Sequence, residues 1–185
     1  MPQFSKEKIR NIALIGHGGE GKTSLLEAML FSVKAIDRLG KVDDGTTVSD
    51  YDAEEISRKM SISLSMSYLY YKDYKINVID VPGFFDFEGE MVSALTVCDG
   101  AIVVTQASGN LSVGTEKALD YCLERKIPVL LFVNGVNKEN SNYANTVAAI
   151  KAKYGNKISA IELPIMNGND MTGYVDILAN KAYAN

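Results

Sequence analysis

The sequence predicts an α/β fold, in which a mostly parallel sheet carries helices on both faces and an antiparallel hairpin at one edge. Short apolar runs alternate along the chain with segments whose apolar residues recur every three or four positions. Two of the runs, at 101–105 and 128–133, are continuous, as buried parallel strands are. The segment 61–70 instead alternates strictly, which predicts a half-buried strand.

The first half of the chain begins with a predicted strand at 9–15, which ends at Gly16, and a helix follows from Lys22. Residues 37–59 are polar with little periodicity, and so long a connection is usually functional. In the strand at 61–70 we expect one apolar, buried face made of Ile62, Leu64, Met66, Tyr68 and Tyr70.

A turn at 72–73 leads from that strand into another at 75–80, so the two are predicted to form a hairpin. Tyrosines cluster around this hairpin, and a stacking platform for nucleic acid would use such rings. That use also needs interleaved basic residues, so packing within the sheet is the favoured interpretation. The remaining helices are predicted at 88–97, 113–125 and 143–153.

Length and charge exclude some classes of protein. The 185 residues fit one domain, and the net charge of −4, from 23 acidic and 19 basic residues, argues against direct binding of duplex DNA. We find no apolar stretch of membrane-spanning length and no signal peptide, so we expect a cytoplasmic protein without membrane contact. Cys98 and Cys122 lack metal-ligand spacing and are interpreted as reduced thiols.

The segment GHGGEGKT at residues 16–23 matches the pattern G-x-x-x-x-G-K-[ST] in full. Its glycines let successive backbone N–H groups point at phosphate oxygens. Lys22 supplies charge to the terminal phosphates, and the Thr23 hydroxyl is placed to bind Mg²⁺. The strand before the segment and the helix after it favour this interpretation over a plain glycine-rich turn, and specify a three-layer P-loop NTPase sandwich. The predicted nucleotide contacts in this loop are Gly16, His17 (with a structural role), Gly18, Gly19, Glu20, Gly21, Lys22, Thr23 and Ser24.

Two further segments follow strands of the predicted sheet. At Asp80-Val81-Pro82-Gly83 the acid can hold Mg²⁺ through water, and the glycine N–H can meet a γ-phosphate, although such a segment alone could be a simple turn. At 134–137 the chain has Asn-Gly-Val-Asn, where GTPases have Asn-Lys-x-Asp. Asn134 and Asn137 are therefore candidates for contacting the base.

Segments along almost the whole chain resemble the N-terminal GTPase domain of the elongation factor G family, and more specifically its elongation-factor-G-like branch. They are GHGGEGKTSLLEAMLF, GTTVSDYDAEEISRKMSIS, KINVIDVPGFFDFEGEMVSAL, CDGAIVV, IPVLLFVNGVN and LPI…TGYVDIL. The resemblance puts Ser61 where the family has the Thr that closes on Mg²⁺ and the γ-phosphate. It also implies that residues 1–185 are one GTPase domain, incomplete at the C-terminal end, where a family insertion starts. Ser159-Ala160 precedes that insertion and does not replace the family's base loop. An exposed sheet edge would then favour self-association.

Three departures from the family carry consequences. Phe84 stands where the family has the histidine that positions the attacking water, which predicts slow intrinsic hydrolysis. Asn137 replaces an Asp that meets two guanine donors, so guanine selectivity should drop and xanthine should fit better. Gly19 and Glu20 replace the family's usual Asp-Ala, which should change any contribution of a monovalent ion to catalysis. The patch formed by Phe84, Phe85 and Phe87 could re-pack in a switch or simply anchor the next helix.

The leading hypothesis is a Mg²⁺-dependent GTPase that binds GTP and GDP and, as part of a longer protein, acts on the ribosome. Lys22, Asp80 and Gly83 would carry the chemistry, and Thr23, Ser61 and Asp80 would organise the metal. Segments 37–59 and 83–90 would be the two switches. A nucleotide-binding scaffold with little hydrolysis and relaxed guanine specificity is the alternative, and an ATPase unrelated to translation is a third.

Overall fold

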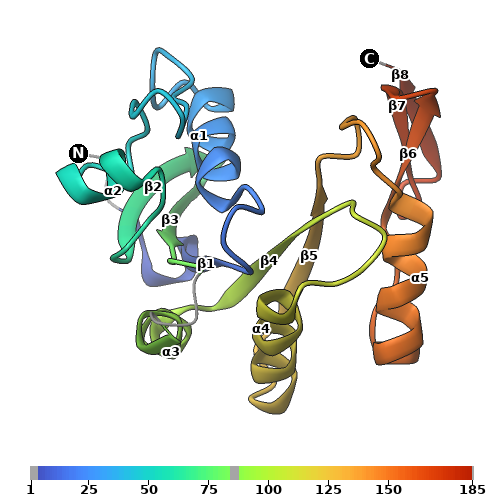
Figure 1. The fold of residues 1–185 in the computed structure, drawn as a ribbon. Coiled ribbons are helices and arrows are strands. Elements are labelled where there is room, and N and C mark those ends of the chain that lie inside the picture. Colours follow the sequence, from blue (N-terminus) through green and yellow to red (C-terminus); the bar gives the residue numbers. More distant parts are fainter. Residues whose placement is uncertain (1–3, 84–87, 185) are drawn as a thin grey trace. The chain divides into compact units, whose positions relative to one another are not determined.

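The computed structural model describes residues 4–83 and 88–184. The chain divides into two compact units, one formed by residues 1–105 and 112–132 and the other by residues 106–111 and 133–185. Figure 1 follows the elements of each unit from the N-terminus to the C-terminus.

The central sheet has five strands in the order β2-β3-β1-β4-β5. Strand β1 pairs in parallel with β3 and with β4, while β2 pairs antiparallel with β3. The sheet is therefore mostly parallel with an antiparallel hairpin at one edge, as the sequence predicts. Its strands are β1 (Ile9–Ile15), β2 (Ser65–Tyr71), β3 (Tyr74–Asp80), β4 (Gly100–Gln106) and β5 (Val129–Asn134).

Helices cover both faces of the sheet at β1. One face carries a core in which Leu26 and Leu30 of α1 pack against Leu14 of β1 and Val78 of β3. Side chains that alternate with these along β1 point to the other face, which carries α3. There Asn11 donates from Nδ2 to the carbonyl oxygen of Val97, at the end of α3 (3.2 Å). The helices of the chain are α1 (Lys22–Ser32), α2 (Ala53–Arg58), α3 (Glu88–Val97), α4 (Val113–Glu124) and α5 (Tyr143–Tyr154), with short 3₁₀ turns at η1 (Lys6–Lys8) and η3 (Gly155–Lys157).

Strand β2 turns the opposite face inward from the one that we expected. Leu69 is its buried residue, with only 3% of its surface exposed, whereas Met66 and Tyr68 are 69% and 51% exposed. Strict alternation shows that the two faces differ, but not which one meets the core. On this edge strand the serine side lies inward, and Leu69 joins the core under α1. The expected burial of the Tyr68 and Tyr70 rings is therefore wrong, although the two rings do pack against each other on the exposed face, with centroids 5.6 Å apart.

Strand β5 also departs from the expectation of a fully buried strand. It ends the order of strands, and Leu130 and Phe132 are partly exposed. An edge strand has a neighbour on one side only, so its side chains receive less cover.

The second unit contains α5 and a three-stranded antiparallel sheet in the order β6-β7-β8. The Asn142 side chain caps α5 by accepting from the N–H of Asn145 (3.0 Å). The sequence did not predict the sheet, whose residues are mostly exposed and so lack an apolar alternation. Its strands are β6 (Glu162–Asn167), β7 (Asp170–Asp176) and β8 (Lys181–Ala184). Among the described residues, no helix combines the length and the hydropathy that crossing a membrane requires.

Candidate nucleotide-binding site

The loop at 16–21 connects the end of β1 to the start of α1, and close approach of main chain explains its first glycine. Gly16 has a φ of +134°, and a Cβ placed on it would overlap the carbonyl oxygen of Val104 in β4. At the other end of the loop, Gly21 precedes α1 in the left-handed region, with a φ of +96°. The loop thus presents the N-terminal end of α1, where backbone N–H groups favour anions.

Lys22 lies buried inside this loop. Its Nζ donates to the carbonyl oxygens of Gly16 (3.1 Å) and His17 (2.9 Å). Burial lowers the pKa of Lys22, and the nearby charges of Asp80, Glu20 and Asp50 oppose that shift. A buried ammonium group with carbonyl partners can exchange them for phosphate oxygens.

Thr23, Ser61 and Asp80 meet at one point, although they come from α1, the loop before β2 and the end of β3. Thr23 Oγ1 donates to Asp80 Oδ2 (2.7 Å) and lies 3.3 Å from Ser61 Oγ. Ser61 Oγ in turn donates to Asp50 Oδ1 (2.7 Å). The sequence assigned no role to Asp50, because the segment that carries it has no periodicity.

This cluster suits a hard divalent cation. One oxygen of each carboxylate, Asp50 Oδ2 and Asp80 Oδ1, is buried without a hydrogen bond to any residue that the structure describes. Burial raises the pKa of Asp80 to about 6, against the opposing hydrogen bond from Thr23 and the charge of Lys22. Burial likewise raises the pKa of Asp50. Desolvated carboxylates beside hydroxyl groups match the oxygen ligands that Mg²⁺ prefers.

No three His, Cys, Asp or Glu side chains form a metal-holding group within residues 4–83 and 88–184. A cation here would therefore depend on the two hydroxyl groups, on water and on phosphate oxygens of a bound nucleotide, as Mg²⁺ sites usually do.

Gly83 lies directly against the loop. A Cβ added to Gly83 would overlap Lys22 Nζ and come within 2.6 Å of the Gly18 nitrogen. Only a residue without a side chain fits there, at the place where a terminal phosphate would contact Lys22. Phe84, Phe85 and Phe87, which the sequence analysis singled out, lie outside the described residues.

Buried carboxylates hold the polar segment at 37–59. Glu27 of α1, fully buried, accepts from the N–H groups of Gly40 (2.9 Å) and Val48 (2.6 Å). Within the segment, Asp52 and Glu55 form a capping box that starts α2. The sequence missed this helix, although an Asp followed three residues later by Glu is the usual signal for one.

Glu55 also fixes the position of Ser61. Its Oε1 accepts from the N–H groups of Ile62 (2.9 Å) and Ser63 (3.1 Å), directly after that serine. Glu90 of α3, in the second predicted switch segment, accepts from the N–H of Leu64 (3.0 Å), three residues after Ser61.

Asn134 and Asn137 belong to the second unit. Asn134 Oδ1 accepts from the N–H of Gly135 (2.8 Å), and its carbonyl accepts from Ala107 (2.9 Å). Gly135 has a φ of +68°, and Asn137 is exposed. The segment is thus an ordered turn that ends in an exposed amide.

A glycine loop between a parallel strand and a helix, with a buried lysine and a hydroxyl–carboxylate cluster beside it, defines a P-loop nucleoside-triphosphate-binding protein. The family profile of the "Elongation factor Tu GTP binding domain" matches residues 7–181. The chain belongs to this family, and within it is an N-terminal GTPase domain of the elongation factor G type.

Similar proteins agree with this assignment. The chain is 36% identical over 177 residues to an elongation factor G-like protein of Thermotoga maritima, covering 96% of this chain and 25% of that protein. It is 37% identical over 174 residues to the mitochondrial ribosome-releasing factor 2 of Danio rerio, covering 94% of this chain and 23% of that protein. A crystal structure from Thermus thermophilus superposes with a TM-score of 0.88 at 33% identity, covering 96% of this chain and 27% of that one. The chain spans about a quarter of the length of these relatives.

Proposed function

We propose that this chain is the Mg²⁺-dependent GTP-driven switch of an elongation factor G-like translation factor, and that both units belong to one GTPase domain. The observation that carries the proposal is the meeting of Thr23, Ser61 and Asp80 beside Lys22. Three segments distant in sequence converge there on the chemistry that a Mg²⁺–triphosphate needs.

In this proposal the N–H groups of the loop and the Lys22 ammonium bind the phosphates. Thr23, Ser61 and Asp80 hold the metal, and Asp50 orients the Ser61 hydroxyl. A bound Mg²⁺ would supply positive charge that offsets the charge of the phosphates. The Gly83 N–H would detect the γ-phosphate, and Asn134 and Asn137 would contact the base. Ser24, which follows on the exposed side of α1, would contribute its backbone N–H.

The proposal includes a ribosomal partner and a cytoplasmic location, and both would be properties of the longer protein. An additional part is self-association along the exposed edge of β5, where Leu130 and Phe132 are partly uncovered. Light scattering of the purified chain at increasing concentration tests self-association. A mass that stays at the monomer value at every concentration would contradict it.

Calorimetric titration of the chain with GDP, XDP and ADP in Mg²⁺ tests nucleotide binding. Tight binding of GDP supports the proposal and shows that Asn137 is tolerated. A preference for XDP supports the donor–acceptor argument at Asn137 and opposes guanine as the natural base. A preference for ADP would contradict the proposal and favour the ATPase alternative.

The second candidate is a nucleotide-binding scaffold with little hydrolysis, motivated by Phe84 and Asn137. Single-turnover hydrolysis of GTP, measured with and without ribosomes, separates the two. Acceleration by ribosomes supports the switch, whereas a rate that ribosomes leave unchanged supports the scaffold.

A further inference from the structure

Glu20 places a carboxylate inside the loop that is to receive phosphates. Only 6% of its surface is exposed. Its Oε2 accepts from the N–H of His17 (3.1 Å) and from the hydroxyl of Thr115 (2.6 Å). Two donors on one oxygen match an ionised carboxylate, which can only accept.

Thr115, in the first turn of α4, holds this carboxylate in place. It is fully buried, and its hydroxyl oxygen accepts from Ser112 Oγ (2.9 Å). The hydroxyl hydrogen of Thr115 is therefore directed to Glu20. Ser112 is fixed in turn, because it caps α4 by accepting from the Thr115 N–H (3.2 Å). The Glu20 side chain is thus anchored from a separate helix.

Glu20 and Lys22 act on opposite sides of the same peptide group. Lys22 donates to the carbonyl oxygen of Gly16, and Glu20 accepts from the N–H of His17. This carbonyl and this N–H are the two halves of one peptide group. Only one peptide group separates the two charges, and Glu20 is among the charges that favour the ammonium form of Lys22. Phosphates that bind here must share Lys22 with Glu20 and accept a like charge nearby.

We propose that Glu20 lowers the affinity of the loop for nucleotide: its charge, anchored by Thr115, competes with the phosphates for Lys22 and speeds their release. The inference rests on the proposed function, since it requires that the loop bind a nucleotide. It assigns a role to a residue that the loop motif identifies only as one of the predicted nucleotide contacts.

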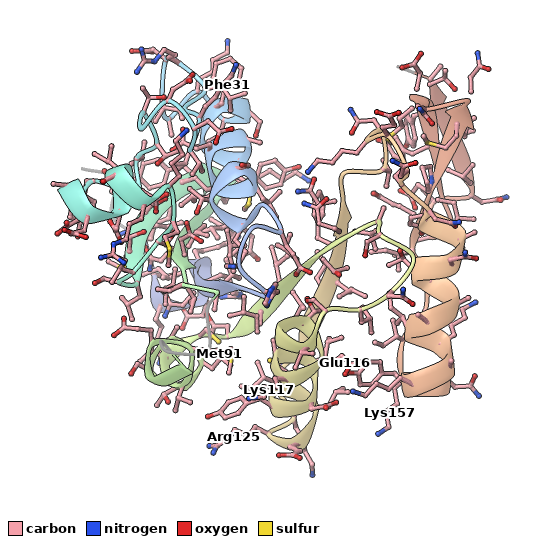
Figure 2. The ribbon with its side chains drawn as sticks, viewed as in Figure 1. Phe31, Met91, Glu116, Lys117, Arg125 and Lys157 are labelled. Atoms are coloured by element: carbon pink, nitrogen blue, oxygen red, sulfur yellow. The ribbon has the colours of Figure 1, made fainter. Side chains whose placement is uncertain are left out.

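Substitution Glu20→Gln removes the charge and keeps a carbonyl oxygen that can accept from both donors. We expect Glu20→Gln to bind GDP about tenfold more tightly than the unaltered chain, through slower dissociation in stopped flow. Glu124→Gln is the matched control, because it makes the same change of net charge at the other end of α4, beside the Arg125 labelled in Figure 2. It should leave the dissociation constant unchanged.

Two further variants keep the inference testable. Glu20→Ala, which introduces the residue that the family usually carries, should also tighten GDP binding. Thr115→Val removes the anchor but keeps the charge, and should tighten GDP binding less than Glu20→Gln does. Circular dichroism melts show which variants are folded.

The outcomes separate this inference from the proposed function. If the unaltered chain binds GDP and a folded Glu20→Gln or Glu20→Ala variant binds it equally or more weakly, the inference is overturned and the proposed function stands. Stronger tightening by Thr115→Val than by Glu20→Gln would also overturn the inference, since the charge is still present. If the unaltered chain binds no nucleotide, the proposed function fails, and this inference fails with it.

Discussion

The protonation of Asp80 provides a quantitative test of the metal cluster. Burial raises its pKa from 3.8 to about 6 in the folded chain. Between these two values the folded state binds more protons than the unfolded state, so the free energy of unfolding falls as the pH rises from about 4 to 6. A difference of 6 − 3.8 = 2.2 in pKa corresponds to about 3 kcal/mol, at roughly 1.4 kcal/mol for each unit.

Asp80→Asn removes this titration and keeps an oxygen that can accept from Thr23. We compare the free energy of unfolding of the variant with that of the unaltered chain, without Mg²⁺. This difference should shift in favour of the variant by up to about 3 kcal/mol between pH 4 and pH 7. Urea unfolding in EDTA measures the difference. Asp73→Asn, at an aspartate with 87% of its side chain exposed, is the control and should track the unaltered chain.

The result that refutes this reasoning is a parallel pH dependence of the unaltered chain and Asp80→Asn between pH 4 and 7. Adding Mg²⁺ and GDP should reverse the ranking at pH 7, because a charged carboxylate binds the cation more strongly than a neutral amide does. An equal stabilisation of both proteins by Mg²⁺ would remove Asp80 from the metal site.

Three substitutions test other contacts of the site. Gly83→Ala should weaken binding of a non-hydrolysable GTP analogue at least tenfold, because its Cβ would overlap Lys22 Nζ. Gly89→Ala, which has open space around it, is the control and should leave binding unchanged. Fluorescence titration compares the two variants. Gly16→Ala should lower the free energy of unfolding by more than about 3 kcal/mol through overlap with the Val104 carbonyl. Gly19→Ala, which has a positive φ but no neighbour within 4 Å, should cost less in the same urea melts. Glu27→Gln would turn an amide N–H₂ group toward the backbone N–H of either Gly40 or Val48. Hydrogen exchange of the amides in 37–59 should therefore accelerate by the equivalent of about 2 kcal/mol. The control Glu124→Gln should exchange at the rate of the unaltered chain.

Local patterns in the sequence predicted the elements on which the site rests. The predicted strand at 9–15 and the helix beginning at Lys22 agree with the structure, because the loop motif fixes both boundaries at once. The hairpin was also predicted, although its inward face was not, since alternation alone does not reveal which side of an edge strand meets a helix.

Burial of charged side chains was not predictable from the sequence. Glu27 in α1, and Asp50 and Glu55 in the polar stretch, resemble ordinary surface acids, yet each is buried and hydrogen-bonded. Their positions depend on which backbone N–H or hydroxyl groups the fold brings to them, and that is a property of tertiary structure. The same holds for the contact between Glu20 and Thr115, which are 95 residues apart.

The attachment of segment 37–59 has a thermal consequence. Its large side chains Leu39, Val48, Tyr51 and Ile56 are already exposed, and Glu27 and Glu55 hold the segment by accepting from backbone N–H groups. Releasing it would hydrate mainly polar groups, and polar hydration adds no positive heat capacity. The opening equilibrium should therefore change little in enthalpy between cold and warm conditions, and respond weakly to urea. The logarithm of the opening constant should therefore vary linearly with reciprocal temperature, without the curvature that exposure of apolar surface produces.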